Sequence, residues 1–305
     1  MSLAEQQSAS RLRRALAHPV TRIVLELAIF LGMLVAVKAI LIKPGLGLLG
    51  LSENVFRAWQ GGLTIAAMFA VYVILIRVYE KRAIHELTIN RLIPDGIAGL
   101  VSATVIVSCI FWMLYLFDAY RIISSGTLAA MIVPGIWVIL LAIMEEMMFR
   151  GILYRNLEEW LGTIAALILS ASLFGLSHLP NEHADAISVI SAGIGGLLMG
   201  ALYSLTRRLW VPIFFHASWN FTQAIFGSTV SGSDLFGSYY ESVREGPEWL
   251  TGGPFGVENS IITLVLLSCL IVPILLRIKS QNNFVKSRRS VQIQQKRQDK
   301  LLANA

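Results

Sequence analysis

Two adjacent carboxylates and an arginine, Glu145, Glu146 and Arg150, stand directly after the apolar run 132–143. A charge near the centre of a bilayer costs at least about 2.5–3.5 kcal/mol, so such groups face a protein interior or a wet cavity. On a helix, Glu146 and Arg150 share a face, which predicts a supporting ion pair. Glu145 points about 100° away from Glu146 and is free for chemistry. We interpret Glu145 as the catalytic base of a membrane-embedded hydrolase.

Three further polar residues, His178, His216 and Asn220, lie in apolar surroundings. His216 and Asn220 are four residues apart, so they project from one face of a helix. Glu145 and His178 stand at about equal distances before and after a predicted helix–helix turn at 161–162. Antiparallel helices joined by a turn hold such residues at the same depth, so we expect Glu145 and His178 to meet.

These residue types suit the hydrolysis of an amide. A glutamate and a histidine can together hold and deprotonate a water molecule. A second histidine and an asparagine can donate hydrogen bonds to a developing oxyanion, each worth about 3 kcal/mol. Alternatively, Glu145, His178 and His216 could bind zinc, which would activate the water itself. The residues leave the zinc route and the metal-free glutamate route open.

The composition places these groups in a membrane. Of 305 residues, 55% are hydrophobic and 14% are charged, whereas soluble domains carry about 25% charged residues. The apolar runs have helix length, so we predict an all-α, multi-pass integral membrane protein, in the inner membrane if the source is a bacterium. The net charge of +6 indicates attraction to membrane lipids, and no nucleic-acid partner is expected.

About eight transmembrane helices are predicted. Basic segments occur at every second connection, which predicts that both termini are cytoplasmic. The charged stretch 150–160 is expected to protrude into the cytoplasm, so the predicted cavity would open on that side. Within the span 186–205, Ala192, Gly196 and Gly200 form a row of small residues, which predicts close helix packing. The predicted spans are 23–42, 63–78, 96–117, 128–160, 163–179, 186–205, 210–226 and 260–276.

Three regions follow from this reading. Residues 1–22 form a basic cytoplasmic leader, and residues 23–278 form the transmembrane protease domain, with its motif core at 132–226. Residues 279–305 form a basic, polar cytoplasmic tail, which we expect to be largely disordered.

The motifs together resemble a known family, the CPBP intramembrane proteases. This group includes the type II CAAX prenyl endopeptidases and the bacteriocin-immunity (Abi) proteins. The resemblance covers about residues 132–226 and is specific because three motifs occur in order on successive spans. They are Glu145-Glu146-x-x-x-Arg150, Phe174-x-x-x-His178 and His216-x-x-x-Asn220.

The resemblance implies a role for each matching residue. Glu145 would be the general base or a metal-linked acid, and His178 would be its water-holding partner. His216 and Asn220 would surround the oxyanion or a metal, whereas Glu146, Arg150 and Phe174 would support the site. Family members are described both as metalloproteases and as metal-free glutamate enzymes, so zinc is one expectation of two. A prenylated CAAX-type substrate is implied by the family alone.

Our leading hypothesis is an intramembrane endopeptidase that cleaves a membrane-associated or lipid-bearing peptide or protein. A non-catalytic immunity or scaffold protein that sequesters a membrane partner is the rival from another class. A small-solute transporter is less well supported, because the sequence shows no inverted repeat and its polar groups cluster in spans four to seven.

Overall fold

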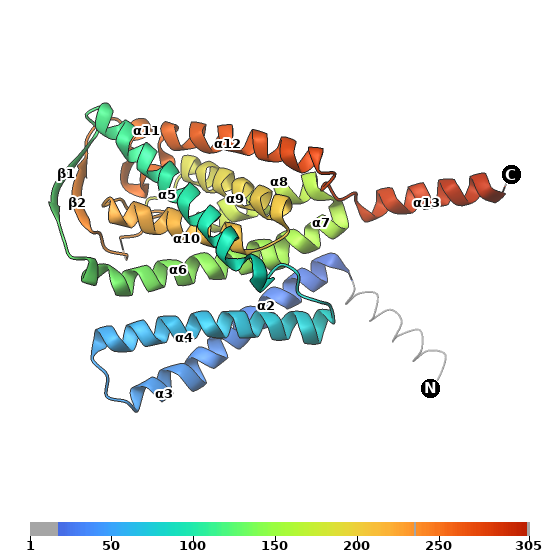
Figure 1. The fold of residues 1–305 in the computed structure, drawn as a ribbon, viewed down its shortest axis with the longest axis horizontal. Helices are drawn as coiled ribbons and strands as arrows, with labels where there is room; N and C mark the ends of the chain where they lie inside the picture. The colour runs from blue at the N-terminus through green and yellow to red at the C-terminus, as the bar shows by residue number, and fades with distance from the viewer. Residues whose placement is uncertain (1–17, 235, 304–305) are drawn as a thin grey trace.

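The computed structural model describes residues 18–234 and 236–303, so residues 1–17 of the predicted leader lie outside the described part. This part is a bundle of apolar helices with a small sheet at one end (Figure 1). The elements are α2 (Pro19–Val37), α3 (Lys43–Gly47), α4 (Glu53–Ile74), α5 (Leu92–Leu116), β1 (Tyr120–Ser125), α6 (Ile132–Glu146), α7 (Arg155–Leu161), α8 (Thr163–Ser177), α9 (Ala186–Thr206), α10 (Trp210–Ile225), β2 (Tyr240–Arg244), α11 (Glu248–Thr251), α12 (Ile261–Ser280) and α13 (Arg288–Ala303).

Helices stand at all eight places where apolar runs predict spans, which confirms the all-α membrane bundle. In the described part, six helical stretches are long and apolar enough to cross a membrane. The other two, α8 and α10, have 15 and 16 residues. At 1.5 Å per residue these reach only about 24 Å, less than the hydrocarbon core of about 30 Å. The two short helices are those that carry the histidine motifs.

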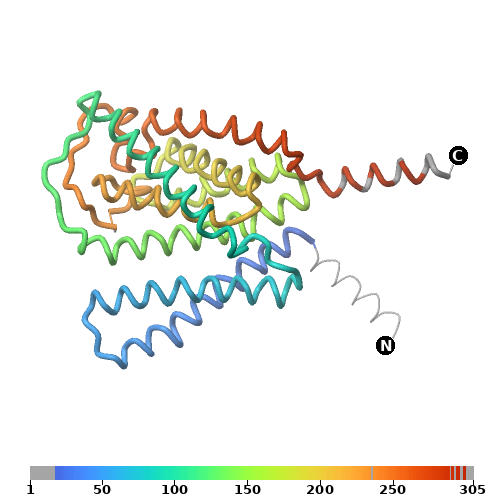
Figure 2. Tube along the Cα trace, viewed as in Figure 1, coloured from blue at the N-terminus to red at the C-terminus, as the bar shows by residue number. Residues whose placement is uncertain are grey.

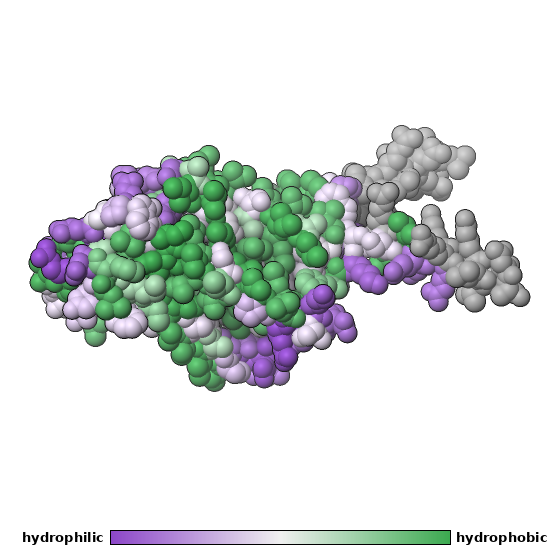
Figure 3. Space-filling model, turned by 90° about the horizontal axis from the view of Figure 1, so that it is seen from above, coloured by the Kyte–Doolittle hydropathy of each residue, from purple (hydrophilic) through white to green (hydrophobic). Residues whose placement is uncertain are grey.

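The outer surface matches a lipid environment. Figure 3 shows hydrophobic residues across the middle of the visible face and hydrophilic residues toward its ends. Many large apolar side chains are exposed, among them Ile97, Trp112 and Ile168, and contiguous exposed apolar surface marks contact with membrane or partner. The chain is therefore an integral, multi-pass membrane protein.

The basic connections gather at one end of the bundle, where α2 begins and α12 ends (Figure 1). Hydrogen bonds join them there: Leu209 N donates to Glu86 O at 2.9 Å, and Thr163 N donates to Val285 O at 3.1 Å. We call this the basic end. That the basic connections lie together at one end agrees with an even number of membrane crossings. That this end faces the cytoplasm stays a prediction.

The charged stretch 150–160 does not protrude from the basic end, so that expectation was wrong. Helix α6 continues through a π-helical segment, Met147–Tyr154, into α7, and Arg155 and Asn156 are buried. The Asn156 amide donates to Glu26 Oε2 at 2.8 Å, and Arg155 forms ion pairs with Glu26 and with Glu80. Arg155 of α7 is buried because partners from α2 and from the π-helical segment Leu75–Glu80, which follows α4, neutralise it.

The opposite end carries structure that the sequence did not predict. Strands β1 and β2 pair antiparallel, with Tyr120 opposite Arg244, so the polar stretch 227–259 is partly ordered into a strand and short helices. The tail, expected to be disordered, is helical over Arg288–Ala303. Its many Gln, Lys and Arg residues favour helix, and Ser287 Oγ caps the start by accepting from Ser290 N at 3.2 Å.

Glycines allow close approach of the helices that carry the motifs. A Cβ added to Gly175 would lie 2.3 Å from Val189 O, so α8 and α9 meet backbone to backbone. On α9, a Cβ at Gly196 would lie 3.0 Å from the Phe174 side chain, and one at Gly200 would lie 2.9 Å from Leu167. The predicted small-residue row thus packs inside the bundle. By contrast, α2 leads away from the motif helices toward α3 (Figure 2), whereas α4 stays packed on α6, where a Cβ added to Gly61 would lie 2.4 Å from the Ile136 side chain.

Candidate active site

The predicted ion pair between Glu146 and Arg150 is present and fully buried. Arg150 Nη1 donates to Glu146 Oε1 at 2.8 Å, and Arg150 Nη2 donates to Gly196 O at 2.8 Å. The guanidinium also lies over the Phe174 ring, 4.7 Å from its centroid, a favourable cation–π arrangement. Arg150 thereby ties α8 and α9 to the motif helix, which is the supporting role expected of these residues.

His216 stands between the two glutamates. Its Nδ1 lies 2.9 Å from Glu146 Oε1, and its Nε2 lies 3.8 Å from Glu145 Oε2. In the neutral tautomer whose Nδ1–H donates to the Glu146 carboxylate, the lone pair of Nε2 faces Glu145. Glu145 Oε2 is buried and has no hydrogen-bond partner among the described residues. An acceptor without a donor at this place suits a water molecule or a substrate group.

His178 does not meet Glu145 as expected. It follows the last residue of α8, and its Nδ1 lies 2.8 Å from Phe174 O. No hydrogen bond or ion pair between His178 and Glu145 occurs in the described chain, and the nearer histidine is His216. The count from the turn at 161–162 does bring the two helices into register, since Phe149 and Phe174, placed by the same count, are in ring contact at 4.9 Å. What the count does not give is the partner of each side chain, and His178 is held by a carbonyl of its own helix.

All four predicted catalytic residues nevertheless line one cavity. The cavity has a volume of about 1000 Å³ and is bounded by Glu145, His178, His216 and Asn220. Residues of α4 at its N-terminal end and of α6 before Glu145 form a further wall. Glu145 keeps 27% of its side chain exposed, so the carboxylate is accessible from this cavity while one oxygen is buried.

The mouth of the cavity is not where the sequence placed it. Beyond the helices, its lining comes from Pro180–Glu182 and from Val230–Asp234. These connections lie at the end of the bundle opposite the basic end (Figure 1). The expected opening toward the basic end was wrong, because the buried charges of α7 close that side.

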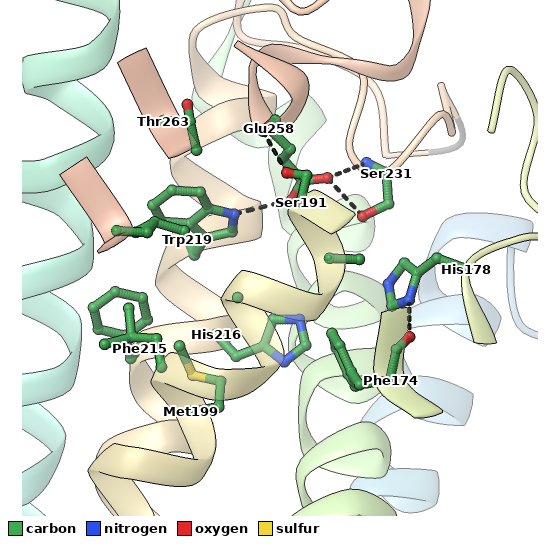
Figure 4. Close-up of a pocket in the computed structure, with 14 residues that line it drawn as sticks. Phe174, His178, Ser191, Met199, Phe215, His216, Trp219, Ser231, Glu258 and Thr263 are labelled. Atoms are coloured by element: carbon green, nitrogen blue, oxygen red, sulfur yellow. Dashed lines mark hydrogen bonds between the residues drawn. The ribbon is translucent and has the colours of Figure 1, made fainter. Parts of the chain in front are cut away.

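Sequence reasoning missed Glu258, which directly precedes the last span. Its carboxylate accepts four hydrogen bonds. Oε1 accepts from Trp219 Nε1 at 2.9 Å and from Gln223 Nε2 at 3.1 Å. Oε2 accepts from Ser231 N at 3.0 Å and from Ser231 Oγ at 2.7 Å; Figure 4 shows the bonds with Trp219 and Ser231. It thus joins α10, which carries His216, to the turn at the cavity mouth. Its position immediately before an apolar run was the available signal.

The expected zinc ligands do not converge. Among residues 18–234 and 236–303, no group of three or more His, Cys, Asp or Glu side chains is placed to hold a metal ion. Glu145 and His216 approach each other, but His178 Nδ1 is taken by a backbone carbonyl. Zinc therefore stays a prediction without support from this arrangement, and the chemistry proposed below uses the chain's own groups.

Comparison with known proteins agrees with the motifs. Residues 127–222 match the family model described as type II CAAX prenyl endopeptidase Rce1-like. This range contains all three motifs. The resemblance to the CPBP family is confirmed. A 78-residue stretch is also 33% identical to the "Putative membrane peptidase YdiL" of Bacillus subtilis (strain 168).

The second match spans 26% of this chain and 30% of the Bacillus protein, so the chain covers less than a third of that relative. No solved structure matches this chain. The match to the family model covers the motif core and ends at residue 222, before Glu258 and the Val230–Asp234 turn.

Proposed function

We propose that this protein is a membrane endopeptidase that activates water between Glu145 and His216. The observation that carries the proposal is the buried, unpartnered Glu145 Oε2, which lies 3.8 Å from His216 Nε2. One water oxygen can lie within hydrogen-bond distance of both atoms. Because the Nδ1 proton of His216 is bound to Glu146, Nε2 and Glu145 Oε2 are both acceptors for the protons of that water.

The reaction follows from these positions. The water oxygen attacks the carbonyl carbon of a peptide bond while one of its protons passes to Glu145. The carbonyl oxygen becomes an oxyanion, to which the side-chain amide of Asn220 in the same cavity can donate. The proton held by Glu145 then passes to the leaving nitrogen, and the C–N bond breaks. His178 lines the same cavity and would orient the water or the substrate.

The substrate we propose is a membrane-associated peptide or protein. Many large apolar side chains cover the outside of the bundle, so the protein is held in a membrane, where a membrane-associated substrate is concentrated around it. The match to a CAAX prenyl endopeptidase model supports a prenylated substrate as one candidate. Membrane lipids would surround the protein in either case.

The test is a cleavage assay on the full chain purified in detergent, with prenylated and unprenylated membrane-proximal peptides. We expect Glu145→Gln to lower cleavage about 10²- to 10⁴-fold. Glu248→Gln is the matched control, because Glu248 is exposed and lies outside the cavity lining. Equal cleavage by wild type and Glu145→Gln would overturn the proposal.

Two further measurements separate the alternatives. If Glu145→Gln also preserved the protein's function in cells, the non-catalytic scaffold reading would replace the proposal. Metal analysis of the same preparation tests the zinc route: stoichiometric zinc that is lost in His178→Ala would support it. Full activity without bound zinc would support the glutamate route.

A further inference from the structure

A buried amide on the wall of the large cavity has no partner in the described chain. Gln60 of α4 is 8% exposed and lines the cavity that holds Glu145. Thr64 Oγ1 donates to the backbone O of Gln60 at 2.6 Å, but within the described part of the chain the side-chain amide of Gln60 has no hydrogen-bond partner. Buried polar groups in proteins are nearly always hydrogen-bonded, so this amide is suited to a group that enters the cavity.

The other polar residues on this wall differ from Gln60. Arg57, one turn earlier on α4, is already paired with Glu53 at 2.6 Å. The indole of Trp137 can only donate a hydrogen bond, and the carboxylate of Glu145 can only accept one. Among the described residues of α4 and α6 that line the cavity, Gln60 alone carries both a donor and an acceptor. A ligand that offers an acceptor and a donor side by side would satisfy it.

The backbone of an extended peptide has this chemistry. In an extended chain, the N–H and the C=O of one residue point to the same side. These two groups can therefore pair with the C=O and the NH₂ of one glutamine side chain. The walls formed by α4 and α6 are helical, so most of their backbone groups are bonded within the helices. An entering peptide must find its partners among the side chains.

The depth of Gln60 in the cavity follows from the packing of α4 on α6 (Figure 1). A Cβ added to Gly61, the next residue, would lie 2.4 Å from the Ile136 side chain, so the two helices touch at this level. Ile136 and Glu145 are nine residues apart on one helix, which is about 14 Å along its axis. An extended peptide covers about 3.3 Å per residue, so Gln60 stands about four residues from the scissile bond, on the side of the cavity mouth.

We propose that Gln60 is a substrate-binding residue whose side-chain amide pairs with the backbone N–H and C=O of one substrate residue, about four residues from the scissile bond. The inference rests on the proposed endopeptidase function, which supplies the peptide. It names the ligand as an extended peptide that is held by its main chain, whatever side chain stands at that position. Gln60 lies outside the range that matches the family model, so no motif assigns this role.

Kinetics on the full chain in detergent test the proposal with the prenylated and unprenylated peptides of the cleavage assay. In Gln60→Met a side chain of similar length replaces the amide, and the substrate backbone loses its partner. Gln60 is far from the reacting atoms, so it should bind the ground state and the transition state equally. We expect KM to rise about 10-fold and kcat to stay within about 2-fold of wild type.

Asn54→Leu is the matched control for Gln60→Met. Asn54 is an exposed amide on the same helix and lies outside the cavity lining. The control should leave both KM and kcat unchanged.

Backbone esters identify the peptide group that is bound. In a series of the same peptides, one amide at a time is replaced by an ester, which removes the N–H donor. Binding is measured on full-length Glu145→Gln protein, with and without Gln60→Met, so the result does not depend on cleavage. One ester, about three to five residues from the cleaved bond, should weaken binding about 10-fold when Gln60 is present and less than about 2-fold in the Gln60→Met protein.

Thermal unfolding tests the alternative that Gln60 has only a structural role. Because the Gln60 amide makes no hydrogen bond within the described chain, Gln60→Met should keep or raise Tm. A fall in Tm without an ester that distinguishes the two proteins would show a structural role and overturn the proposal.

The remaining outcomes separate this inference from the proposed function. Glu145-dependent cleavage with equal ester profiles in both proteins would refute the role of Gln60 and retain the endopeptidase. Ester-sensitive binding through Gln60 without any cleavage by the wild type would refute the endopeptidase and retain the binding role. A complete peptide set with neither binding nor cleavage would overturn both.

Discussion

The Glu146 carboxylate neutralises Arg150 and positions His216, and two substitutions should separate its effect on stability from its effect on peptide cleavage. Glu146 is fully buried, and its Oε1 accepts from Arg150 and His216. In Glu146→Met the guanidinium of Arg150, 1% exposed, would keep its charge without an anion. His216 would lose the acceptor that fixes its tautomer.

The magnitude follows from what Arg150 retains. Breaking a buried ion pair by removing one partner costs about 3–5 kcal/mol. Arg150 keeps its bond to Gly196 O and its contact with the Phe174 ring, so we expect the lower part of this range, about 3 kcal/mol. At about 2 °C per kcal/mol for a chain of this size, Tm should fall by about 6 °C.

The double variant Glu146→Met/Arg150→Met tests whether the unpaired charge of Arg150 causes the loss of stability. Replacing a buried ion pair by apolar residues of similar volume is often neutral or stabilising, so thermal unfolding in detergent should return close to the wild-type Tm. Peptide cleavage should stay low in both variants, because His216 remains without its carboxylate. A double variant as unstable as the single one would show that an unpaired charge is not the cause. A double variant with wild-type cleavage would show that Glu146 does not position His216.

Three further predictions concern the surroundings of the site. Gly175→Ala places a Cβ 2.3 Å from the backbone of α9, so overpacking should lower stability by about 1–3 kcal/mol, measured as a fall in Tm. In Glu258→Gln the new NH₂ group cannot accept from the donors that the carboxylate binds, so the hydrogen bond from Ser231 N should weaken and hydrogen exchange at that amide should become faster. The control Glu248→Gln should leave the exchange rate unchanged. Hydrogen bonds from the hydroxyl and the backbone N–H of Ser188 hold the pKa of Asp185 below its usual value. This carboxylate caps α9, so Asp185→Ala should cost about 1 kcal/mol at neutral pH. Because the folded-state pKa is lowered, the difference in unfolding free energy between wild type and Asp185→Ala should be full above about pH 4 and vanish as pH falls through the folded pKa. Unfolding curves of both proteins at several pH values measure it.

The sequence predicted the bundle well because each span is a local property. Apolar length and alternating basic connections depend on residues close in sequence, and helices occur at each predicted span. The Glu146–Arg150 pair was also predictable, since helical spacing alone brings the two residues together. The small-residue row at Gly196 was predictable for the same reason.

The partner of each side chain and the direction in which the cavity opens depend on contacts between distant residues, and there the sequence failed. Helical counting placed Glu145 level with His178, and both line one cavity, but it did not reveal that His216 is the histidine nearer to Glu145. Arg155 seemed a cytoplasmic charge until its partners, Glu26 and Glu80, were known. The role of Glu258 also depends on groups from the segments around Trp219 and Ser231, which no local pattern connects.

Ion pairs at the basic end connect two of the spans without a motif, α2 and α4, to the motif helix. Arg22 forms ion pairs with Glu26 at 2.8 Å and Glu80 at 2.5 Å, and Arg155 of α7 joins both glutamates. Because α7 continues the helix of Glu145, these pairs fix α2 and α4 to the motif helix. At its other end α4 supplies Gln60 and its neighbours to the cavity wall, so charges buried at one end hold a wall at the other. Under the proposed function, α4 would therefore form part of the substrate-binding surface although no motif residue lies on it.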